Sequence, residues 1–324
     1  MYLAASLFLL HPAQRISLTS WTVHPSTVIG LLALGALYLW RARVAERDGS
    51  GAAAESRSGG APPPGSYAAS GGVPYPTLPH RRPTPRTGPA GDVPSVAQRV
   101  AFFAALAVMF VSLNGPLHDL SDYYLFSGHM VQHLILTLVV PPLLIHGTPG
   151  GMLRPALRVR PVAALARWVT RPAVCFALFN VVIAAWHLPP LYNLAIRYHP
   201  VHIAQHLMFL VTAVLMWWPL LSPLPELPRL AYPGQMLYCF LMSIPMSIVA
   251  ICVEMADHVL YPAYASAPRI WGISPLQDQQ IGGLIMWIPG GLFFYVVMTF
   301  VFFKWAARQE DTAAGAQVDW RPTT

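Results

Sequence analysis

Residues 127–147 read SGHMVQHLILTLVVPPLLIHG, an apolar run that carries His129 and His133 near its start. A helix needs about 20 mostly apolar residues to cross the hydrocarbon core of a bilayer, and this stretch is long enough. Residues four apart lie on the same face of a helix, so both imidazoles are expected to point the same way. A second pair, His202 and His206, opens another apolar run, HPVHIAQHLMFLV. These two pairs frame the question of function.

The composition is that of an integral membrane protein. Of its 324 residues, 55% are hydrophobic and only 10% are charged, whereas soluble domains carry about 25% charged residues. The cysteines, Cys175, Cys239 and Cys252, fall inside apolar runs and do not indicate a disulfide framework. The sequence shows no nucleophile–base motif, phosphate loop or dinucleotide fingerprint, so we do not expect an enzyme.

The apolar runs predict an all-α bundle of seven transmembrane helices. The predicted spans are residues 26–40, 96–113, 128–146, 172–186, 201–221, 232–253 and 281–305. Pro141-Pro142 is expected to kink the far end of the third span.

The chain divides by composition into a few segments. The predicted segments are an N-terminal stretch with the first span (1–44), a disordered cytoplasmic linker rich in Pro and Gly (45–95), a six-helix membrane bundle (96–308) and a polar cytoplasmic tail (309–324).

The basic residues predict that the N-terminus lies outside and the C-terminus in the cytoplasm. Cytoplasmic loops of membrane proteins carry an excess of Lys and Arg. Placing the linker inside brings most of the basic residues near the spans to the cytoplasmic side, namely Arg41, Arg43, Arg47, Arg99, Arg154, Arg158, Arg160, Arg167, Arg171, Arg229, Lys304 and Arg308. The net charge of +7 is therefore explained by topology. We expect the lipid bilayer, and no nucleic acid, to be the partner of these charges.

With this orientation most histidines fall in one layer near the outer surface. The layer comprises His24, His118, His129, His133, His187, His199, His202, His206 and His258. His133 and His206 lie a turn deeper than their helical partners. They are expected to face the bundle interior, because ionisable groups are costly against lipid.

Metal binding is the chemistry that this layer favours. Imidazole suits copper, zinc, iron and nickel, and sulfur ligands favour reduced copper. Met130 lies beside His129, Met208 follows His206, and Cys252 lies near Glu254. A His-rich site with sulfur nearby, on the oxidising side of a membrane, predicts copper. The residues expected to assist or orient the ligands are Met130, Glu254, Asp278, Gln279 and Gln280.

Other interpretations stay open at this point. A lone interfacial histidine usually anchors a helix end, and His24, His118, His199 and His258 fall in that class. The paired histidines could form a hydrogen-bond network that holds helices together. Haem ligated by two histidines, a bound quinone, or a purely structural scaffold are further alternatives.

Several stretches resemble one family. They are SGHMVQH, LVVPPLL, AWHLPPLYN, VHIAQHLMFL, MWWPLLSP and LYPAYASAPRIWGISPLQDQQIGGLIMWIPGG. Over residues 96–305 the chain resembles the CtaG-like cytochrome c oxidase assembly proteins, a seven-helix family associated with caa-type oxidases. The resemblance implies a bacterial plasma-membrane protein that helps a haem–copper oxidase to mature through copper delivery. Its implied partners are oxidase subunits and a periplasmic copper chaperone.

The resemblance also points to particular residues. The histidines that match its motifs are His129, His133, His187, His202 and His206. Asp278, Gln279 and Gln280 match its polar turn before the last span. His118 and His258 lie outside the pattern, and the long linker departs from the short connection that the family implies.

Overall fold

The structure, a computed structural model, is helical and describes residues 21–58 and 93–318, with side chains described over 21–47 and 93–311. Predictions for residues 1–20, 59–92 and 319–324 lie outside the described residues. The α-helices are α2 (Pro25–Ser58), α3 (Val96–Leu113), α4 (Pro116–Tyr123), α5 (Phe126–Leu134), α6 (Val140–Gly147), α7 (Gly150–Leu153), α8 (Arg160–Val169), α9 (Pro172–His187), α10 (Pro189–Arg197), α11 (His199–Leu221), α12 (Tyr232–Glu254), α13 (Pro262–Ala265) and α14 (Pro275–Val318).

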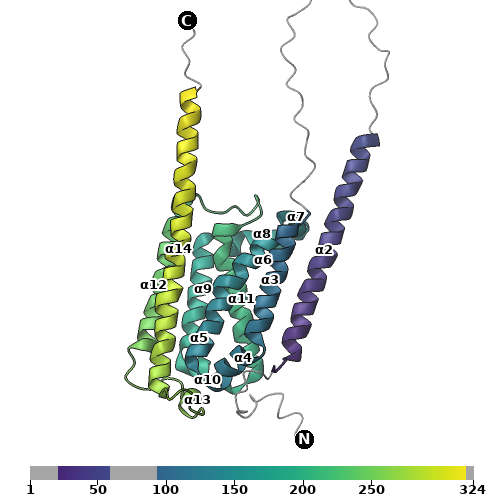
Figure 1. The fold of residues 1–324 in the computed structure, drawn as a ribbon. Helices are drawn as coiled ribbons and strands as arrows, with labels where there is room; N and C mark the ends of the chain where they lie inside the picture. Colours follow the sequence, from purple (N-terminus) through teal and green to yellow (C-terminus); the bar gives the residue numbers. More distant parts are fainter. Residues whose placement is uncertain (1–20, 59–92, 319–324) are drawn as a thin grey trace, which may run out of the picture.

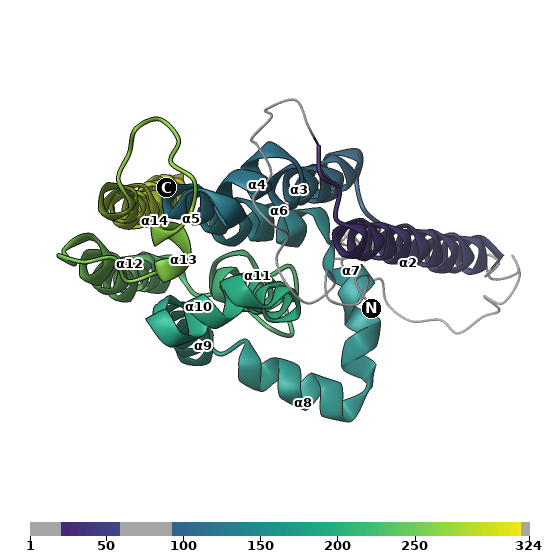
Figure 2. The ribbon, with the colours of Figure 1, turned by 90° about the horizontal axis from the view of Figure 1, so that it is seen from below.

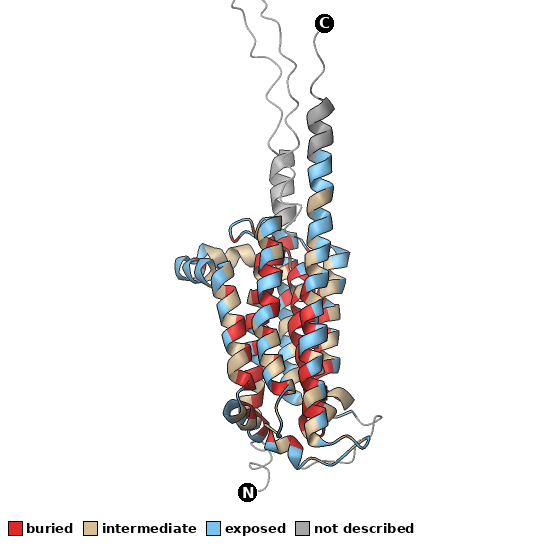
Figure 3. Cartoon of the chain, turned by 90° about the vertical axis from the view of Figure 1, so that its left-hand side faces the viewer, coloured by how far each residue is buried: buried red, intermediate tan, exposed pale blue. Residues whose placement is uncertain are grey.

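The long helices run side by side in a bundle with two distinct ends (Figure 1). The short helices α4, α10 and α13 cover one end, called the α10 end below, and α7 and α8 lie at the other, called the α8 end. The first described residues of the chain lie at the α10 end, whereas α14 projects beyond the α8 end (Figure 1). Buried residues line the interior of the bundle, and the outer faces are exposed (Figure 3).

Within the described residues, six helices are long and apolar enough to cross a membrane, which makes the chain a multi-pass membrane protein. The candidate spans are Pro25–Arg47, Val96–Leu113, Phe126–Gly147, His199–Leu221, Tyr232–Glu254 and Pro275–Asp311. The predicted span over 172–186 is a helix but is not among these six. Helix α9 has 16 residues and is too short to count alone, and a seventh span exists only if α8 and α9, bent by 73°, count as one.

Helix α8 explains that bend. Figure 2, which looks along the bundle, shows α8 lying across the helix direction. It exposes Val162, Leu165 and Trp168 and carries Arg160 and Arg167. An amphipathic helix of this kind suits a membrane surface better than its interior.

Helix α2 is longer than predicted. It packs on α3, where Tyr38 stacks on Phe102 at 3.9 Å and donates a hydrogen bond to the carbonyl of Gly147 at 3.0 Å. It then continues to Ser58, so the first part of the predicted linker 45–95 is helical. Residues 42–47 and 52–57 are rich in Ala, Glu and Arg, which are strong helix formers. The helix at the other end of the chain also runs on, to Val318 in the predicted tail.

The third span, Phe126–Gly147, contains a π-helical turn at Ile135–Val139, just before Pro141-Pro142. Pro141 has no N–H to donate, so the carbonyl of Thr137, four residues earlier, loses its helical partner. Trp217 of α11 donates its indole N–H to that carbonyl at 2.9 Å. At the prolines where a kink was predicted, the helical register changes locally and Trp217 of α11 supports the carbonyl that is left without a partner.

Glycines let α14 pack closely against its neighbours. A Cβ added at Gly283 would lie 2.7–2.9 Å from atoms of Glu254 on α12, two of them backbone. A Cβ added at Gly282 would lie 2.4 Å from the ring of Phe126 on α5. Small residues of this kind allow membrane helices to approach at short distance. The contact of Gly282 with Phe126 holds α14 against α5, the helix that carries the first histidine pair.

Candidate metal centre

The candidate site lies between α5 and α11 near the α10 end. His129 and His133 share one face of α5, with ring centroids 4.1 Å apart. His202 and His206 share one face of α11, with ring centroids 4.3 Å apart. The two faces meet, because 5.6 Å separates the rings of His129 and His202 and 5.5 Å separates those of His133 and His206. The structure therefore brings the two pairs into one cluster.

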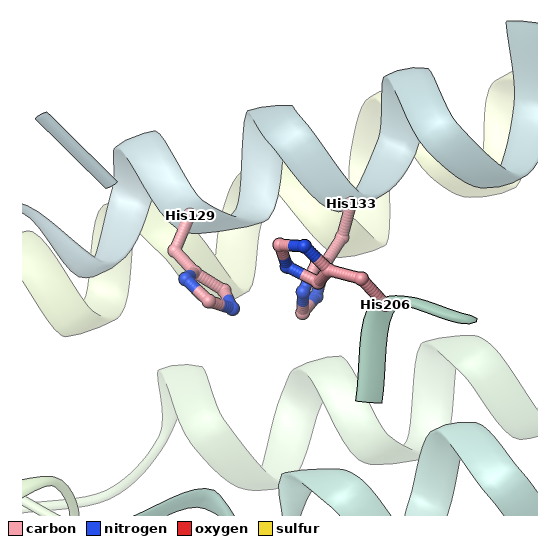
Figure 4. Close-up of side chains that lie close together, drawn as sticks. All are labelled: His129, His133 and His206. Atoms are coloured by element: carbon pink, nitrogen blue, oxygen red, sulfur yellow. The ribbon is translucent and has the colours of Figure 1, made fainter. Parts of the chain in front are cut away.

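Three of these imidazoles form one candidate ligand group. His129, His133 and His206 each offer a ring nitrogen within 4.8 Å of the others, and Figure 4 shows the rings gathered together. His129 and His133 are buried, and their ring nitrogens have no hydrogen-bond partner among the described residues. Each buried polar atom left unpaired costs about 1–3 kcal/mol. A transition-metal ion would satisfy these nitrogens, so the residues fit a metal site.

A carboxylate completes a second group with two of the histidines. Asp122, His129 and His202 also bring their ligand atoms within 4.8 Å of one another. Asp122 Oδ2 lies 3.4 Å from His202 Nδ1, and Asp122 Oδ1 lies 3.9 Å from His129 Nδ1. Burial by itself would raise the pKa of Asp122. The neighbouring His118, His202 and His129 outweigh burial and lower that pKa, which favours the charged carboxylate.

Sequence reasoning missed Asp122. The residue lies in the short helix α4, outside the apolar runs on which the prediction concentrated. One pattern could have revealed it: His118 and Asp122 are four residues apart, and their side chains approach to 3.4 Å. This is a third i, i+4 pair of metal-competent residues, and α4 folds it against the other two.

A hydrogen-bonded shell orients Asp122 and His118. Gln132 donates from Nε2 to the carbonyl of Ser112 at 2.5 Å and faces His118 Nδ1 at 3.1 Å. Ser121 Oγ lies 2.9 Å from the Gln132 carbonyl oxygen and 3.0 Å from Asp122 Oδ1. With Nδ1 accepting from Gln132, a neutral His118 carries its proton on Nε2, toward Asp122. Buried amides and hydroxyls thus supply the orienting groups that metal ligands need.

His187 sits at the edge of the cluster. Its ring lies 6.2 Å from that of His133, and it belongs to neither ligand group. Its Nδ1 is 2.7 Å from the carbonyl of Ile183, so Nδ1 carries the proton and donates it. Its Nε2 is buried without a hydrogen-bond partner among the described residues. His187 is thus held in the tautomer whose Nε2 has a free lone pair, although it lies outside both ligand groups.

Aromatic side chains close the α14 side of the cluster. Tyr192 packs 5.3 Å from the ring of His129 and 4.2 Å from that of Tyr261. Tyr264 lies behind them and donates a hydrogen bond to the carbonyl of Ser121 at 2.7 Å. Because these rings are buried, water is excluded from this side of the imidazoles.

The sulfur atoms named in the sequence prediction lie away from both ligand groups. Met130 is buried in the apolar core, where a Cβ at Gly282 would lie 3.3 Å from its Cγ. It therefore faces α14, because adjacent helical residues point about 100° apart. Met208 and Cys252 are exposed. The two candidate ligand groups contain imidazoles and one carboxylate, and Cys252 belongs to neither.

Asp278 supports α5 instead of a ring. Its carboxylate accepts hydrogen bonds from the backbone N–H groups of Phe126 at 2.6 Å and Ser127 at 3.1 Å, and from the Ser127 hydroxyl at 2.5 Å. These groups belong to the first turn of α5, so α14 supplies an N-terminal cap to the helix that carries His129 and His133. The prediction that Asp278 orients an imidazole directly is corrected to an indirect role.

Gln279 of α14 has a similar structural role, because it holds the end of α12 and the loop that leads to α14. Its side-chain oxygen accepts from the backbone N–H of Leu260 at 2.7 Å, and its NH₂ group donates to the carbonyls of Val253 and His258. Gln280 and Glu254 are half-buried and belong to neither ligand group. None of these residues lies among the candidate ligands in the described structure.

Most of the chain matches a known protein family. The model of the cytochrome c oxidase caa3 assembly factor family matches residues 78–308. The chain belongs to this family. The matched region contains every candidate ligand described above, together with Asp278 and Gln279. Assembly factor families are typically not catalytic.

Three mycobacterial proteins of unassigned function are similar to this member of the caa3 assembly factor family. Proteins from Mycobacterium bovis and Mycobacterium tuberculosis are each 29% identical to it over 209 residues, which cover 59% of this chain and 31% of the relative. A protein from Mycobacterium leprae is 26% identical over 245 residues, covering 69% of this chain and 36% of the relative. The chain thus spans about a third of the length of these relatives. No solved structure gives a significant match.

Proposed function

We propose that this chain holds copper as cargo and passes it to a haem–copper oxidase in the same membrane. The observation that carries the proposal is the trio His129, His133 and His206, whose ring nitrogens converge within 4.8 Å from two different membrane helices. Unpaired imidazole nitrogens in a membrane interior are costly unless a ligand satisfies them. The family supplies the destination, because its description names a cytochrome c oxidase.

The roles within the site follow from position. His133 and His206 are the core ligands and His129 completes the set, whereas His202 and His187 lie beside the trio and exchange with it during release. Three imidazoles with an open position suit a site that must give up its metal. The family, and not the donor atoms, favours copper over zinc, since imidazole binds both.

The membrane and its sides are part of the same proposal. The chain is placed in the bacterial plasma membrane, with the α10 end outside. In support, basic residues gather at the α8 end: Arg41 donates to the carbonyl of Met152 in α7, and Arg154 pairs with Glu226 at 2.8 Å. The histidine cluster then opens toward the side where a periplasmic copper chaperone and the copper-binding face of the oxidase are found.

Metal analysis of the purified full chain tests the proposal. The wild type, loaded with copper under reducing conditions and then desalted, is expected to retain about one ion per chain, since one trio makes one site. His133→Ala/His206→Ala should retain at least about tenfold less and leave oxidase subunits made but inactive. His258→Ala is the matched control, because His258 is exposed and pairs only with Asp257 in the described contacts. A wild type that holds no copper in either oxidation state overturns the proposal.

A quinone site is the second candidate function, and one observation favours it. An apolar pocket of about 330 Å³ lies between α2, α3 and α11, and Leu34, Met109 and Leu210 line it with His118 at one end. A quinone that binds here would protect the protein against thermal unfolding without copper.

Haem binding and a scaffold role are weaker alternatives. For haem, His133 packs edge-on against Phe209 at 4.6 Å, where a porphyrin would need space. A Soret band in the purified protein would nevertheless establish haem. A scaffold predicts full oxidase activity in the double variant.

A further inference from the structure

We infer that the cluster contains two ion-binding stations that share His129. The inner station is the trio His129, His133 and His206, and the second, called the Asp122 station, is formed by Asp122, His202 and His129. The inference rests on the proposed function for the inner station alone. The Asp122 station takes a divalent transition-metal ion, because it pairs a carboxylate with two imidazoles.

The spacing of Asp122 and His202 is that of two ligands on one ion. In a tetrahedral site with bonds of about 2.0–2.1 Å, neighbouring ligand atoms lie roughly 3.3–3.4 Å apart. Asp122 Oδ2 and His202 Nδ1 are 3.4 Å apart. Asp122 Oδ2 is almost fully buried and makes no well-formed hydrogen bond in the described structure, since its imidazole neighbours, His202 and His118, lie 3.4 Å away. A buried carboxylate oxygen that lacks a well-formed hydrogen bond is costly, and a cation between it and His202 removes the cost.

The surrounding residues hold Asp122 in place for this role. Ser121 bonds its Oδ1, and His118, held by Gln132, approaches its Oδ2 at 3.4 Å. These contacts leave the face toward His129 and His202 open. A structural carboxylate would instead be expected to have both oxygens hydrogen-bonded by its neighbours.

His129 makes the two stations alternatives. Its Nδ1 faces Asp122, and Figure 4 shows its ring beside His133 and His206. Both of its ring nitrogens lack a hydrogen-bond partner among the described residues. A neutral imidazole has one nitrogen with a free lone pair and one that carries the proton. His129 can therefore serve one station at a time, and the chain holds one ion in either of two positions.

The two positions explain how a buried ion can leave. His202 of one station and His206 of the other both line the pocket beside α2, whereas His129 and His133 do not. Each station thus has one ligand at the pocket wall, and the two stations share His129. An ion that changes station keeps His129 as a neighbour throughout, so it exchanges ligands stepwise and never lies uncoordinated in an apolar interior.

Copper loading of the full chain in detergent separates the stations. Cu²⁺ and Cu⁺ are loaded in parallel on five proteins: wild type, Asp122→Asn, His133→Ala/His206→Ala, the triple combination and His258→Ala. Metal content and the electron paramagnetic resonance spectrum of Cu²⁺ are measured, and unfolding midpoints establish that each variant is folded. His202→Ala replaces Asp122→Asn if the latter does not fold.

The expected results differ between the two ions. His133→Ala/His206→Ala keeps about one Cu²⁺ per chain through the Asp122 station but loses Cu⁺, and adding Asp122→Asn lowers its Cu²⁺ affinity by at least about tenfold. Asp122→Asn alone keeps Cu⁺. The inference is overturned if the double variant binds no Cu²⁺, or if Asp122→Asn has no effect in that background. If the wild type holds Cu²⁺ but no Cu⁺, and loses the Cu²⁺ on Asp122→Asn, the inner station fails while the Asp122 station stands.

Discussion

Two helix contacts in the bundle are built differently: α12 and α14 pack closely through a glycine, whereas α5 and α11 meet through polar side chains. Gly283 brings α14 so close to α12 that an added Cβ would lie 2.7 Å from Glu254. Helices α5 and α11 instead meet through imidazoles, and His133 keeps both ring nitrogens unpaired. The first contact is built for stability and the second retains polar atoms that cost stability until something binds them. This difference supports the proposal that the second contact is the functional one.

The largest effect on stability is expected at the first contact. Gly283→Ala places a methyl group against the α12 backbone, so the helices must separate, at a cost of about 3 kcal/mol. The unfolding midpoint in detergent measures this loss of stability. Gly291→Ala on the same helix is the control, since its Cβ would meet only Ser247 Oγ at 3.8 Å. Equal unfolding midpoints for the two variants would show that close packing at Gly283 does not stabilise the α12–α14 contact.

Asp278 links the two contacts, because it belongs to α14 and caps α5. Asp278→Ala removes three hydrogen bonds from the first turn of α5 and is expected to cost about 2 kcal/mol. Copper retention should fall as well, since that turn positions His129. Asp278→Asn keeps an acceptor and should restore part of both losses. A variant that loses stability but retains all its copper would show that the cap does not serve the site.

A smaller effect is expected at the π-helical turn beside the site. Trp217→Phe removes the donor to the Thr137 carbonyl that Pro141 leaves without a helical partner, and should cost about 1 kcal/mol. Pro141→Ala returns a backbone N–H that can replace it. In a double-mutant cycle, Trp217→Phe should therefore cost less in the Pro141→Ala background. An unchanged cost would mean that the indole contributes only by packing.

The smallest effect on stability is expected where the effect on metal binding is greatest. His133→Leu/His206→Leu replaces unpaired imidazoles with apolar side chains of similar size, so the metal-free protein should be as stable as the wild type or slightly more so. The unfolding midpoint of metal-free protein measures this. A large destabilisation would show that these histidines are structural, and would favour a hydrogen-bond network over a metal site.

Sequence patterns predicted the parts of the site that lie on long, regular helices. The spacing of His129 with His133, and of His202 with His206, places each pair on one helical face, and the cost of polar groups in lipid turns both faces inward. Asp122 was missed, since no periodicity shows that α4 folds back over α5. Asp278 was assigned to the wrong task, because a carboxylate before a span looks the same whether it orients a ring or caps a helix.

The sequence likewise predicted some of the helices more accurately than others. Apolar length located the spans over 96–113, 201–221 and 232–253, where composition alone decides. It leaves α9 open, because this helix has 16 residues and forms a seventh candidate span only together with α8, across a bend of 73°. It also placed the end of α2 too early, since helix propensity carries a helix beyond its apolar part.

The central claim is that copper is held by imidazoles from α5 and α11. X-ray absorption spectroscopy at the copper edge of the reduced, copper-loaded full chain measures those ligands directly. The account predicts nitrogen ligands with the outer-shell scattering of imidazole, and a loss of that signal in His133→Ala/His206→Ala. A copper ion coordinated mainly by sulfur, or an imidazole spectrum that the double variant leaves unchanged, would contradict it.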